Sequence, residues 1–512
     1  MSAASLLSAL VLFCAQDSKH LTVDLLTAVE NCDGSTAERV AGDLARANDA
    51  AAVKALMRAI ETARVKEPMV EKECDTWLKK VEQLTPDPPS TPIPTDQYNA
   101  LMDAREKYGL ALGQRRGLAK VRPAVLEALR AFTSAGAGEE LIRFLGSKDP
   151  EIREAALDGL RNVKGPEIDE EIEKTLVKKA RSEKDPAVRA GMIDGIKARG
   201  IKTKDAIAAI RAGLLCSDWP VILSSALAVK EMDLRELAID VIEAIKAKDG
   251  RLQFALNDVL RQMTGYNYDG DYEGWKAWHE RFGEGFVAGD YQRPKASGQD
   301  AVASSTFYGV PIVSKALCFV LDRSGSMSEP AKWRRKVATG DTGAGDLGEP
   351  SGNRKIDIAR FELKYALAKL PDGTIFNVIF YNQEFSVLFE KPQKLTAGSR
   401  RQAFDFIDAL EPEGATNIYD SVEKGFTFGP ASRAGARALG EIDTIMLLSD
   451  GMPNHGKYTT PNDILQGVED INRNVKIQID TVYVGSTGGR DPGAQLLEDL
   501  AMRNHGRFVS FD

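Results

Sequence analysis

The chain has 512 residues, which is too long for one ordinary domain and predicts two or three. Its hydrophobic content of 43% and charged content of 28% are typical of a globular protein with buried cores. The net charge of −8 and the pI near 5.4 argue against nucleic acid or an anionic membrane as the main partner. Five cysteines without a CxxC pair and four scattered histidines argue against a disulfide scaffold, a zinc site and a histidine-based catalytic centre.

The N-terminus contains a short apolar stretch, Leu6 to Ala15, which polar residues follow. It is too short to span a bilayer, and no other segment has transmembrane length. It is typical of a compact signal peptide over 1–16, although no Lys or Arg precedes it; an ordinary first helix is the alternative. We therefore expect export to the periplasm, cell surface or medium, and a cytoplasmic location if no signal peptide is present. Export would allow Cys32 and Cys74 to pair, but the sequence does not place them within bridging distance.

Residues 17–84 have the apolar pattern of amphipathic helices. The residues with helix-like spacing are Val40, Leu44, Val53, Leu56, Met57 and Ile60. Residues 85–96, "TPDPPSTPIPTD", are rich in proline, which breaks helices. We expect a helical region followed by a linker.

A motif that combines aspartate with proline occurs three times in the next segment. "DPEIREAALDGLRNV" begins at Asp149, "DPAVRAGMIDGIKAR" at Asp185, and the more divergent "DWPVILSSALAVKEM" at Asp218. Aspartate caps helices and proline suits their first turn. The apolar stripes of the first two units consist of Ile152, Ala155, Ala156, Leu160, Val188, Met192, Ile193 and Ile196. Helical units of this size stack because one unit cannot bury its apolar face alone.

The segment around these units resembles HEAT repeats, most closely over 120–265, and the resemblance implies a helical repeat region over 97–286. An unrelated helical bundle is the alternative. Acidic and basic residues are balanced in this region, so no basic stripe indicates nucleic-acid binding.

The end of this region contains acidic residues with part of the spacing of a calcium loop. Asp269, Asp271 and Glu280 fall at the first, third and twelfth positions of an EF-hand pattern, with Gly274 at the sixth. The 269–280 segment also places three aromatic residues at helical spacing: Trp275, Trp278 and Phe282. We favour a helix that closes the repeats by aromatic packing over a calcium site.

Residues 287–310 are polar and without period, and are expected to be a second linker. From 311 to 512, apolar strands alternate with amphipathic helices. The expected strands are 314–322, 374–382, an edge strand at 385–390, 443–451, 476–485 and 507–511. The expected helices are 355–370, 401–410, 418–426, 461–474 and 493–505. This alternation predicts an α/β domain with a mostly parallel sheet covered by helices on both faces.

Oxygen-bearing side chains follow the ends of two of these strands. "CFVLDRSGSM" presents Asp322, Ser324 and Ser326, "MLLSDGMPN" presents Asp450, and the loop "EPEGATNIYD" presents Thr416. In parallel sheets, ligands bind beyond the carboxyl ends of the strands. Carboxylate and hydroxyl oxygens suit Mg²⁺, with Mn²⁺ or Ca²⁺ as alternatives.

This domain resembles the von Willebrand factor type A fold, and the oxygen ligands resemble its metal-ion-dependent adhesion site. The DxSxS element matches Asp322, Ser324 and Ser326, the threonine matches Thr416, and the late aspartate matches Asp450. The resemblance covers about 311–512. It departs from the family at residues 329–354, a longer link than usual between the metal loop and the first helix. This insertion includes Trp333, Arg334 and Arg335, and is expected to be either a flap over the metal or a disordered loop.

The ligand set predicts recognition without catalysis. Two carboxylates and three hydroxyls leave a dication partly neutralised, so a carboxylate on a partner protein can complete its coordination. No Ser-His-Asp set, P-loop or acid–base carboxylate pair is present in the sequence. The leading hypothesis is a non-enzymatic scaffold with a metal-dependent site and a helical repeat surface. Two alternatives are an RNA-binding scaffold resembling the Ro ribonucleoprotein and a type A subunit that assists a separate AAA+ ATPase. The sequence does not indicate the oligomeric state.

Overall fold

The computed structural model describes residues 18–86, 93–246, 248–294, 305–331, 349–429, 442–485 and 491–511. The segment expected to be a signal peptide and most of the 329–354 insertion, including Trp333, Arg334 and Arg335, lie outside these ranges. The described chain divides into two compact units, Met1–Thr175 with Gly456–Tyr458, and Leu176–His455 with Thr459–Asp512. The division falls inside a helix and not at the linkers expected from the sequence. Among the described residues, no helix combines the length and apolar character needed to cross a membrane.

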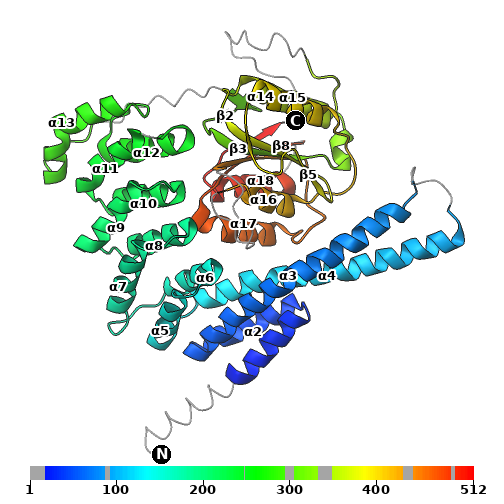
Figure 1. Ribbon diagram of the computed structural model, residues 1–512, viewed down its shortest axis with the longest axis horizontal. Helices are drawn as coiled ribbons and strands as arrows, with labels where there is room; N and C mark the ends of the chain where they lie inside the picture. Colours follow the sequence, from blue (N-terminus) through cyan, green and yellow to red (C-terminus); the bar gives the residue numbers. More distant parts are fainter. Residues whose placement is uncertain are drawn as a thin grey trace, which may run out of the picture. The chain divides into compact units, whose positions relative to one another are not determined.

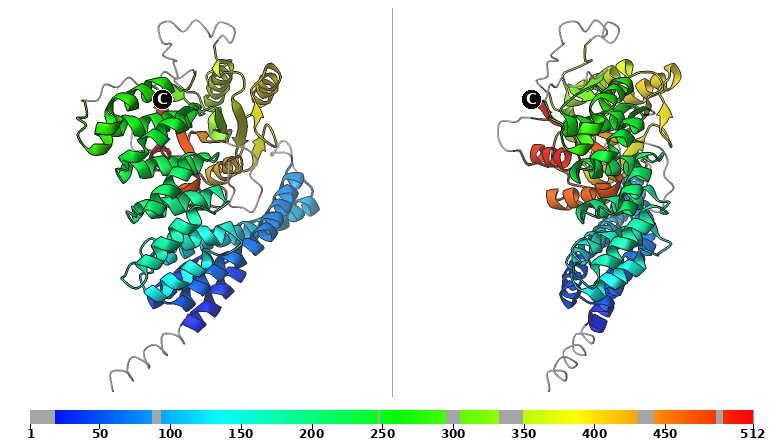
Figure 2. Two further views of the ribbon diagram at one scale, coloured as in Figure 1. Left: turned by 60° about the vertical axis from the view of Figure 1, so that its left-hand side comes forward. Right: turned by 90° about the vertical axis from the view of Figure 1, so that its left-hand side faces the viewer.

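The first unit is helical and contains a long hairpin (Figures 1 and 2). After a helix over 18–30 come α2 (Gly34–Ala47), α3 (Ala50–Leu84), α4 (Thr95–Arg130), α5 (Ala135–Phe144) and α6 (Pro150–Leu160). The helices α3 and α4, of 35 and 36 residues, lie side by side and are longer than the helices expected for HEAT repeats. The backbone of α4 lies very close to the turn before α2 at Gly117. A Cβ atom at this position would be 1.8 Å from the carbonyl oxygen of Cys32, so only glycine fits there.

The second unit begins with stacked helices. α7 (Asp169–Ala180) spans the division between the units. It is followed by α8 (Pro186–Ala198), α9 (Lys204–Leu214), α10 (Trp219–Glu231), α11 (Ala238–Lys246), α12 (Gly250–Thr264) and α13 (Tyr272–Ala288). The apolar stripes expected in the first two repeat units are buried throughout. The side chain of Asp149 caps α6 through Glu151 N, and that of Asp185 caps α8 through Ala187 N and Val188 N. Asp218 precedes α10 but forms no such bond, so the expected side-chain cap is absent in the third unit.

The expected closing helix is α13, and its aromatic packing is confirmed. Trp275 and Trp278 are buried with ring centroids 6.0 Å apart, and Trp278 also packs on Phe282. Asp271 does not point into an EF-hand loop but caps α13 through the backbone N–H groups of Glu273 and Gly274. The side chain of Asn257 holds the preceding turn by accepting hydrogen bonds from Gly270 N and Trp275 Nε1.

The C-terminal α/β fold is the one expected from the sequence. The strands are β3 (Ala316–Asp322), β4 (Ile375–Tyr381), β5 (Phe385–Val387), β6 (Gln393–Lys394), β7 (Thr444–Ser449), β8 (Gln478–Val484) and β9 (Phe508–Phe511). They form a seven-stranded sheet in the order β5-β4-β3-β7-β8-β9, with β6 also paired to β4. The pairs β4–β3, β3–β7, β7–β8 and β8–β9 are parallel, and β5 is an antiparallel edge strand.

Helices flank this sheet (Figure 1). They are α14 (Lys355–Lys369), α15 (Ala397–Asp408), α16 (Ile418–Phe426), α17 (Pro461–Val475) and α18 (Pro492–Arg503). α14 packs on α15, while α17 packs on both α16 and α18. The central strands are almost fully buried, which explains their continuous apolar sequences.

One part of the segment expected to be a linker is structured. Ser305–Phe307 (β1) and Val310–Ile312 (β2) form a β-hairpin whose turn residues, Tyr308 and Gly309, have φ angles of +49° and +78°. Two successive positive φ values are typical of a tight hairpin turn. Phe307 is fully buried and packs on Phe319 of β3, so the hairpin contributes to the core of the α/β domain.

Candidate metal centre

The two aspartates expected from the sequence follow neighbouring strands. Asp322 is the last residue of β3, and Asp450 follows β7, with Leu321 paired to Leu448 in parallel register. The carboxyl ends of the two strands therefore lie at the same edge of the sheet. Both aspartates are nearly inaccessible, with 0% of Asp322 and 7% of Asp450 exposed.

Hydrogen bonds connect four of the five expected residues into one chain. The carboxylate of Asp322 accepts from Ser324 N at 2.7 Å. The hydroxyls of Ser324 and Ser326 lie 3.1 Å apart, and Ser326 Oγ donates to Asp450 Oδ1 at 2.8 Å. Residues from two separate loops thus bring their oxygens within contact distance.

The fifth expected residue, Thr416, is placed by backbone contacts. Gly325 N donates to Gly414 O at 3.0 Å, which joins the serine turn to the threonine loop. Thr416 N donates to Asn454 Oδ1 at 2.9 Å, and Thr416 O accepts from Asn454 N. Only 6% of Thr416 is exposed, and its hydroxyl forms no hydrogen bond within the described ranges.

Sequence reasoning did not identify three further residues at this edge. Ser449 Oγ donates to Asp322 Oδ2 at 2.6 Å. The Lys355 ammonium lies 2.8 Å from both Asp450 Oδ2 and Glu329 Oε2. Ser449 precedes Asp450, so its position next to a candidate ligand was a usable signal. Lys355 begins a helix, and nothing in its local sequence indicated a contact 95 residues away.

The ends of the 329–354 insertion meet beside this cluster. Lys355 N donates to Glu329 O at 2.9 Å, and Ala331 N donates to Asn353 O at 2.8 Å. Pro330 and Arg354 form an isolated antiparallel β-bridge. The insertion therefore leaves and rejoins the domain at one place, next to Asp450.

The comparisons with known proteins agree with this fold. Residues 344–510 match the family model of the von Willebrand factor type A domain. The C-terminal domain is a von Willebrand factor type A domain. The matched residues begin after Asp322, Ser324 and Ser326, so the match itself does not include the first part of the candidate metal centre.

Curated relatives of the type A domain include inter-alpha-trypsin inhibitor heavy chain H3. The protein from Pongo abelii is 23% identical over 303 residues, which are 53% of this chain and 30% of the relative. The Homo sapiens protein is 26% identical over 202 residues, 39% of this chain and 19% of the relative. The chain therefore spans less than a third of the length of these relatives.

Two solved structures are also similar to the chain. One is described as von Willebrand factor type A from Catenulispora acidiphila, with a TM-score of 0.27, 18% identity and 40% of each chain covered. The other is described as proximal thread matrix protein 1 from the mussel byssus with a zinc-occupied MIDAS motif. It has a TM-score of 0.26 and 13% identity, and covers 39% of this chain and 44% of its own.

The electrostatics of the type A domain fit a cation at this edge. Burial, reinforced by the neighbouring charge of Asp450, raises the pKa of Asp322 from 3.8 to about 6. Burial tends to lower the pKa of Lys355, but its hydrogen bonds to Asp450 and Glu329 outweigh this and raise the pKa. Two buried carboxylates therefore lie close to each other, and within the described ranges the Lys355 ammonium contacts one of them, that of Asp450.

The donor chemistry also fits a hard divalent cation. Carboxylate and hydroxyl oxygens are the ligands that Mg²⁺ prefers. Within the part of the chain that the structure describes, no group of three or more His, Cys, Asp and Glu residues has the geometry of a metal site. The candidate centre differs from such a group because it combines two carboxylates with hydroxyls.

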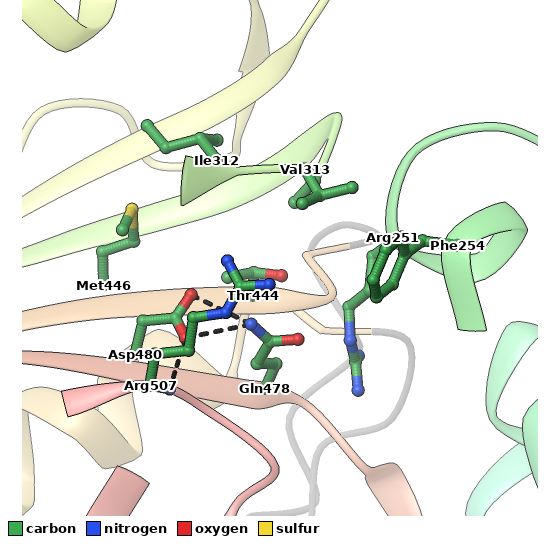
Figure 3. A pocket seen from close by; sticks show the side chains of 10 residues that line it. Arg251, Phe254, Ile312, Val313, Thr444, Met446, Gln478, Asp480 and Arg507 are labelled. Atoms are coloured by element: carbon green, nitrogen blue, oxygen red, sulfur yellow. Dashed lines mark hydrogen bonds between the residues drawn. The ribbon is translucent and has the colours of Figure 1, made fainter. Parts of the chain in front are cut away.

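A depression lies where β7 and β8 begin, at the end of the strands opposite to Asp322 and Asp450 (Figure 3). It is lined by Arg251, Phe254, Ile312, Val313, Ser314, Thr444, Met446, Gln478, Asp480 and Arg507. Asp480 already accepts hydrogen bonds from Gln478 Nε2 at 3.0 Å and from Arg507 N at 2.8 Å. The other polar side chains of the depression also have partners: Ser314 and Thr444 donate to the Asp443 carboxylate, and Arg251 donates to backbone carbonyl oxygens. We assign no ligand to the depression.

Proposed function

We propose that the chain is a non-enzymatic interaction protein whose type A domain binds an acidic partner through a divalent cation. The supporting observation is the hydrogen-bonded chain from Asp322 through Ser324 and Ser326 to Asp450. Together with Thr416, these residues would supply two carboxylates and three hydroxyls to one ion. Mg²⁺ is the proposed ion because it takes oxygen ligands and keeps part of its water shell.

The proposed partner group is a carboxylate on another protein. The hydroxyl ligands are neutral, and the Lys355 ammonium balances part of the charge of the two carboxylates, so a bound dication leaves net positive charge at the site. A carboxylate from outside neutralises this charge and fills a coordination position held by water. The ion would supply the positive charge that attracts the partner carboxylate, and the type A domain would hold the ion in place. The stacked helices of the second unit are proposed as a further binding surface, with the resemblance to HEAT repeats as support. Export of the protein is also proposed, on the apolar stretch from Leu6 to Ala15.

Isothermal titration calorimetry with MgCl₂ and MnCl₂ tests the metal site. We expect the wild type to bind and Asp450→Asn to bind about 10- to 100-fold more weakly, the loss usual when a metal-site group is changed. Asp372→Asn is the control, because Asp372 is 74% exposed and pairs only with Arg400 among the described residues. Equal metal binding by wild type and Asp450→Asn would contradict the proposed site.

Partner recognition is tested on the same proteins. An affinity capture from the native host, run with Mg²⁺ and with EDTA, should recover partners that chelation releases. Blocking the carboxyl groups of a captured partner should abolish its metal-dependent binding. Partners that bind equally with EDTA would be assigned to another surface, and their binding should survive in Asp450→Asn.

A further inference from the structure

The ammonium group of Lys355 lies at the edge of the sheet at which the metal is proposed to bind. Lys355 Nζ lies 2.8 Å from Asp450 Oδ2, on the carboxylate whose other oxygen accepts from Ser326. The Lys355 side chain is 10% exposed and that of Asp450 is 0% exposed. Coulomb interactions are strong at such sites because little water screens them.

We infer that Lys355 is an internal counter-cation that lowers the metal affinity of the isolated type A domain. This inference rests on the proposed function, since it concerns the same site. Lys355 cancels one of the two buried negative charges, so an arriving dication meets both a smaller net negative charge and a nearby ammonium. Metal binding is then weak until a partner carboxylate adds negative charge, which couples the binding of the ion to the binding of the partner.

The fold holds Lys355 firmly in this position. It is the first residue of α14, and its backbone N–H donates to Glu329 O. The adjacent Pro330–Arg354 bridge fixes the backbone on both sides. On the solvent side, the Glu329 carboxylate accepts from the same ammonium at 2.8 Å and is 63% exposed. Glu329 thus balances part of the charge of Lys355 from outside the buried cluster.

This arrangement makes opposite predictions for two substitutions. Lys355→Met removes the ammonium, and we expect Mg²⁺ and Mn²⁺ to bind about tenfold more tightly, since a unit charge at such short range shifts an ionic equilibrium by one power of ten or more. Glu329→Gln leaves the ammonium less neutralised and should weaken metal binding by about two- to threefold, because Glu329 is solvent-exposed. Lys355→Arg keeps the charge and should remain within about threefold of wild type.

Lys364→Met is the matched control. Lys364 lies on the same helix and pairs with Asp408, whose side chain is 61% exposed. The Lys364→Met variant should bind metal with the same affinity as wild type. The measurement is calorimetric titration of the full chain with each metal alone, together with thermal unfolding in EDTA to confirm that each variant folds. If Lys355→Met does not fold, Glu329→Gln still tests the sign of the charge effect.

The outcomes separate this inference from the proposed function. Equal or weaker metal binding by Lys355→Met, with measurable binding by wild type, would overturn the inference and leave the metal site intact; it would mean that Lys355 mainly positions Asp450. Binding by Lys355→Met with none by wild type would support the inference. An absence of metal binding in all variants would overturn both.

Discussion

The guanidinium of Arg251 lies 2.7 Å from the backbone carbonyl oxygen of Asp443, which follows it by 192 residues in the chain. A second bond of 2.7 Å joins Arg251 to the carbonyl oxygen of Lys476. Asp443 and Lys476 immediately or closely precede β7 and β8, so one side chain of α12 holds the beginnings of two central strands. The Arg251 residue is 8% exposed, and its guanidinium also lies 5.3 Å from the ring centre of Trp219.

Replacing Arg251 should therefore destabilise the second unit. Arg251→Met removes one donor from each of two carbonyl oxygens; that of Asp443 still accepts from Gln478 N, while that of Lys476 loses its donor. We expect the free energy of unfolding to fall by about 1–3 kcal/mol. Arg261→Met on the same helix should cost less than about 1 kcal/mol, because Arg261 is 38% exposed and pairs with a residue three positions away. Urea unfolding of both variants measures the difference. Equal losses would contradict the assigned role of Arg251.

The pKa of Asp322 predicts how stability depends on pH without metal. Because the folded protein raises this pKa from 3.8 to about 6, the folded state binds the proton more tightly than the unfolded state. The protonated carboxyl therefore contributes stability below about pH 4, and this contribution is lost as pH rises through about 6. In EDTA, Asp322→Asn should remove this dependence and raise stability at pH 7.5 by up to about 3 kcal/mol. Chemical unfolding of wild type and Asp322→Asn at pH 4.5 and 7.5 tests this prediction. If the free energy of unfolding depended on pH equally in both proteins, the prediction would be wrong.

Two helix N-termini with similar sequences should differ in how much their aspartates contribute to the free energy of unfolding. Asp185→Ala removes bonds to Ala187 N and Val188 N and should lower the free energy of unfolding by about 1 kcal/mol. Asp218→Ala should change it by less than about 0.5 kcal/mol, because Asp218 forms no side-chain bond to its helix. Thermal unfolding of both variants compares them directly. A larger loss at Asp218 would show that the repeated motif does not act through capping.

Thr416 offers a test of a single proposed ligand. Thr416→Ala removes a hydroxyl that bonds to none of the described residues, so stability in EDTA should change by less than about 0.5 kcal/mol. The Mg²⁺ affinity should fall less than in Asp450→Asn, since a neutral ligand is lost. Thr416→Ser keeps the hydroxyl and should bind like wild type. Metal binding by the alanine variant equal to that of wild type would reject Thr416 as a ligand.

Local sequence patterns predicted most of the C-terminal fold. The strands β3 and β7 are continuous apolar runs, and a helix pattern follows each. The sequence therefore predicted both the type of these elements and their order. The β1–β2 hairpin was missed because β1 and β2 have three residues each and a proline lies within β2, which weakens a strand pattern. The sequence signal for this hairpin was the aromatic pair Phe307 and Tyr308 before Gly309, and both side chains are buried.

The contacts at the candidate metal centre were predicted only in part, for a related reason. Asp322, Ser324, Ser326 and Asp450 belong to short local motifs, and the parallel register of β3 and β7 brings them together. Lys355 and Glu329 contact each other across the insertion, and Lys355 reaches Asp450 from the start of α14. No spacing rule along the chain encodes a contact of this kind, since it depends on how α14 packs on the sheet.

The β-bridge between Pro330 and Arg354 has a consequence for the length of the insertion that it closes. A closed loop loses entropy only with the logarithm of its length, so doubling it costs about 0.6 kcal/mol. The domain can therefore accept segments of very different lengths at this place without a change in its core. This makes the segment a natural grafting point, where a foreign peptide would be displayed next to the edge of the sheet that carries Asp322 and Asp450.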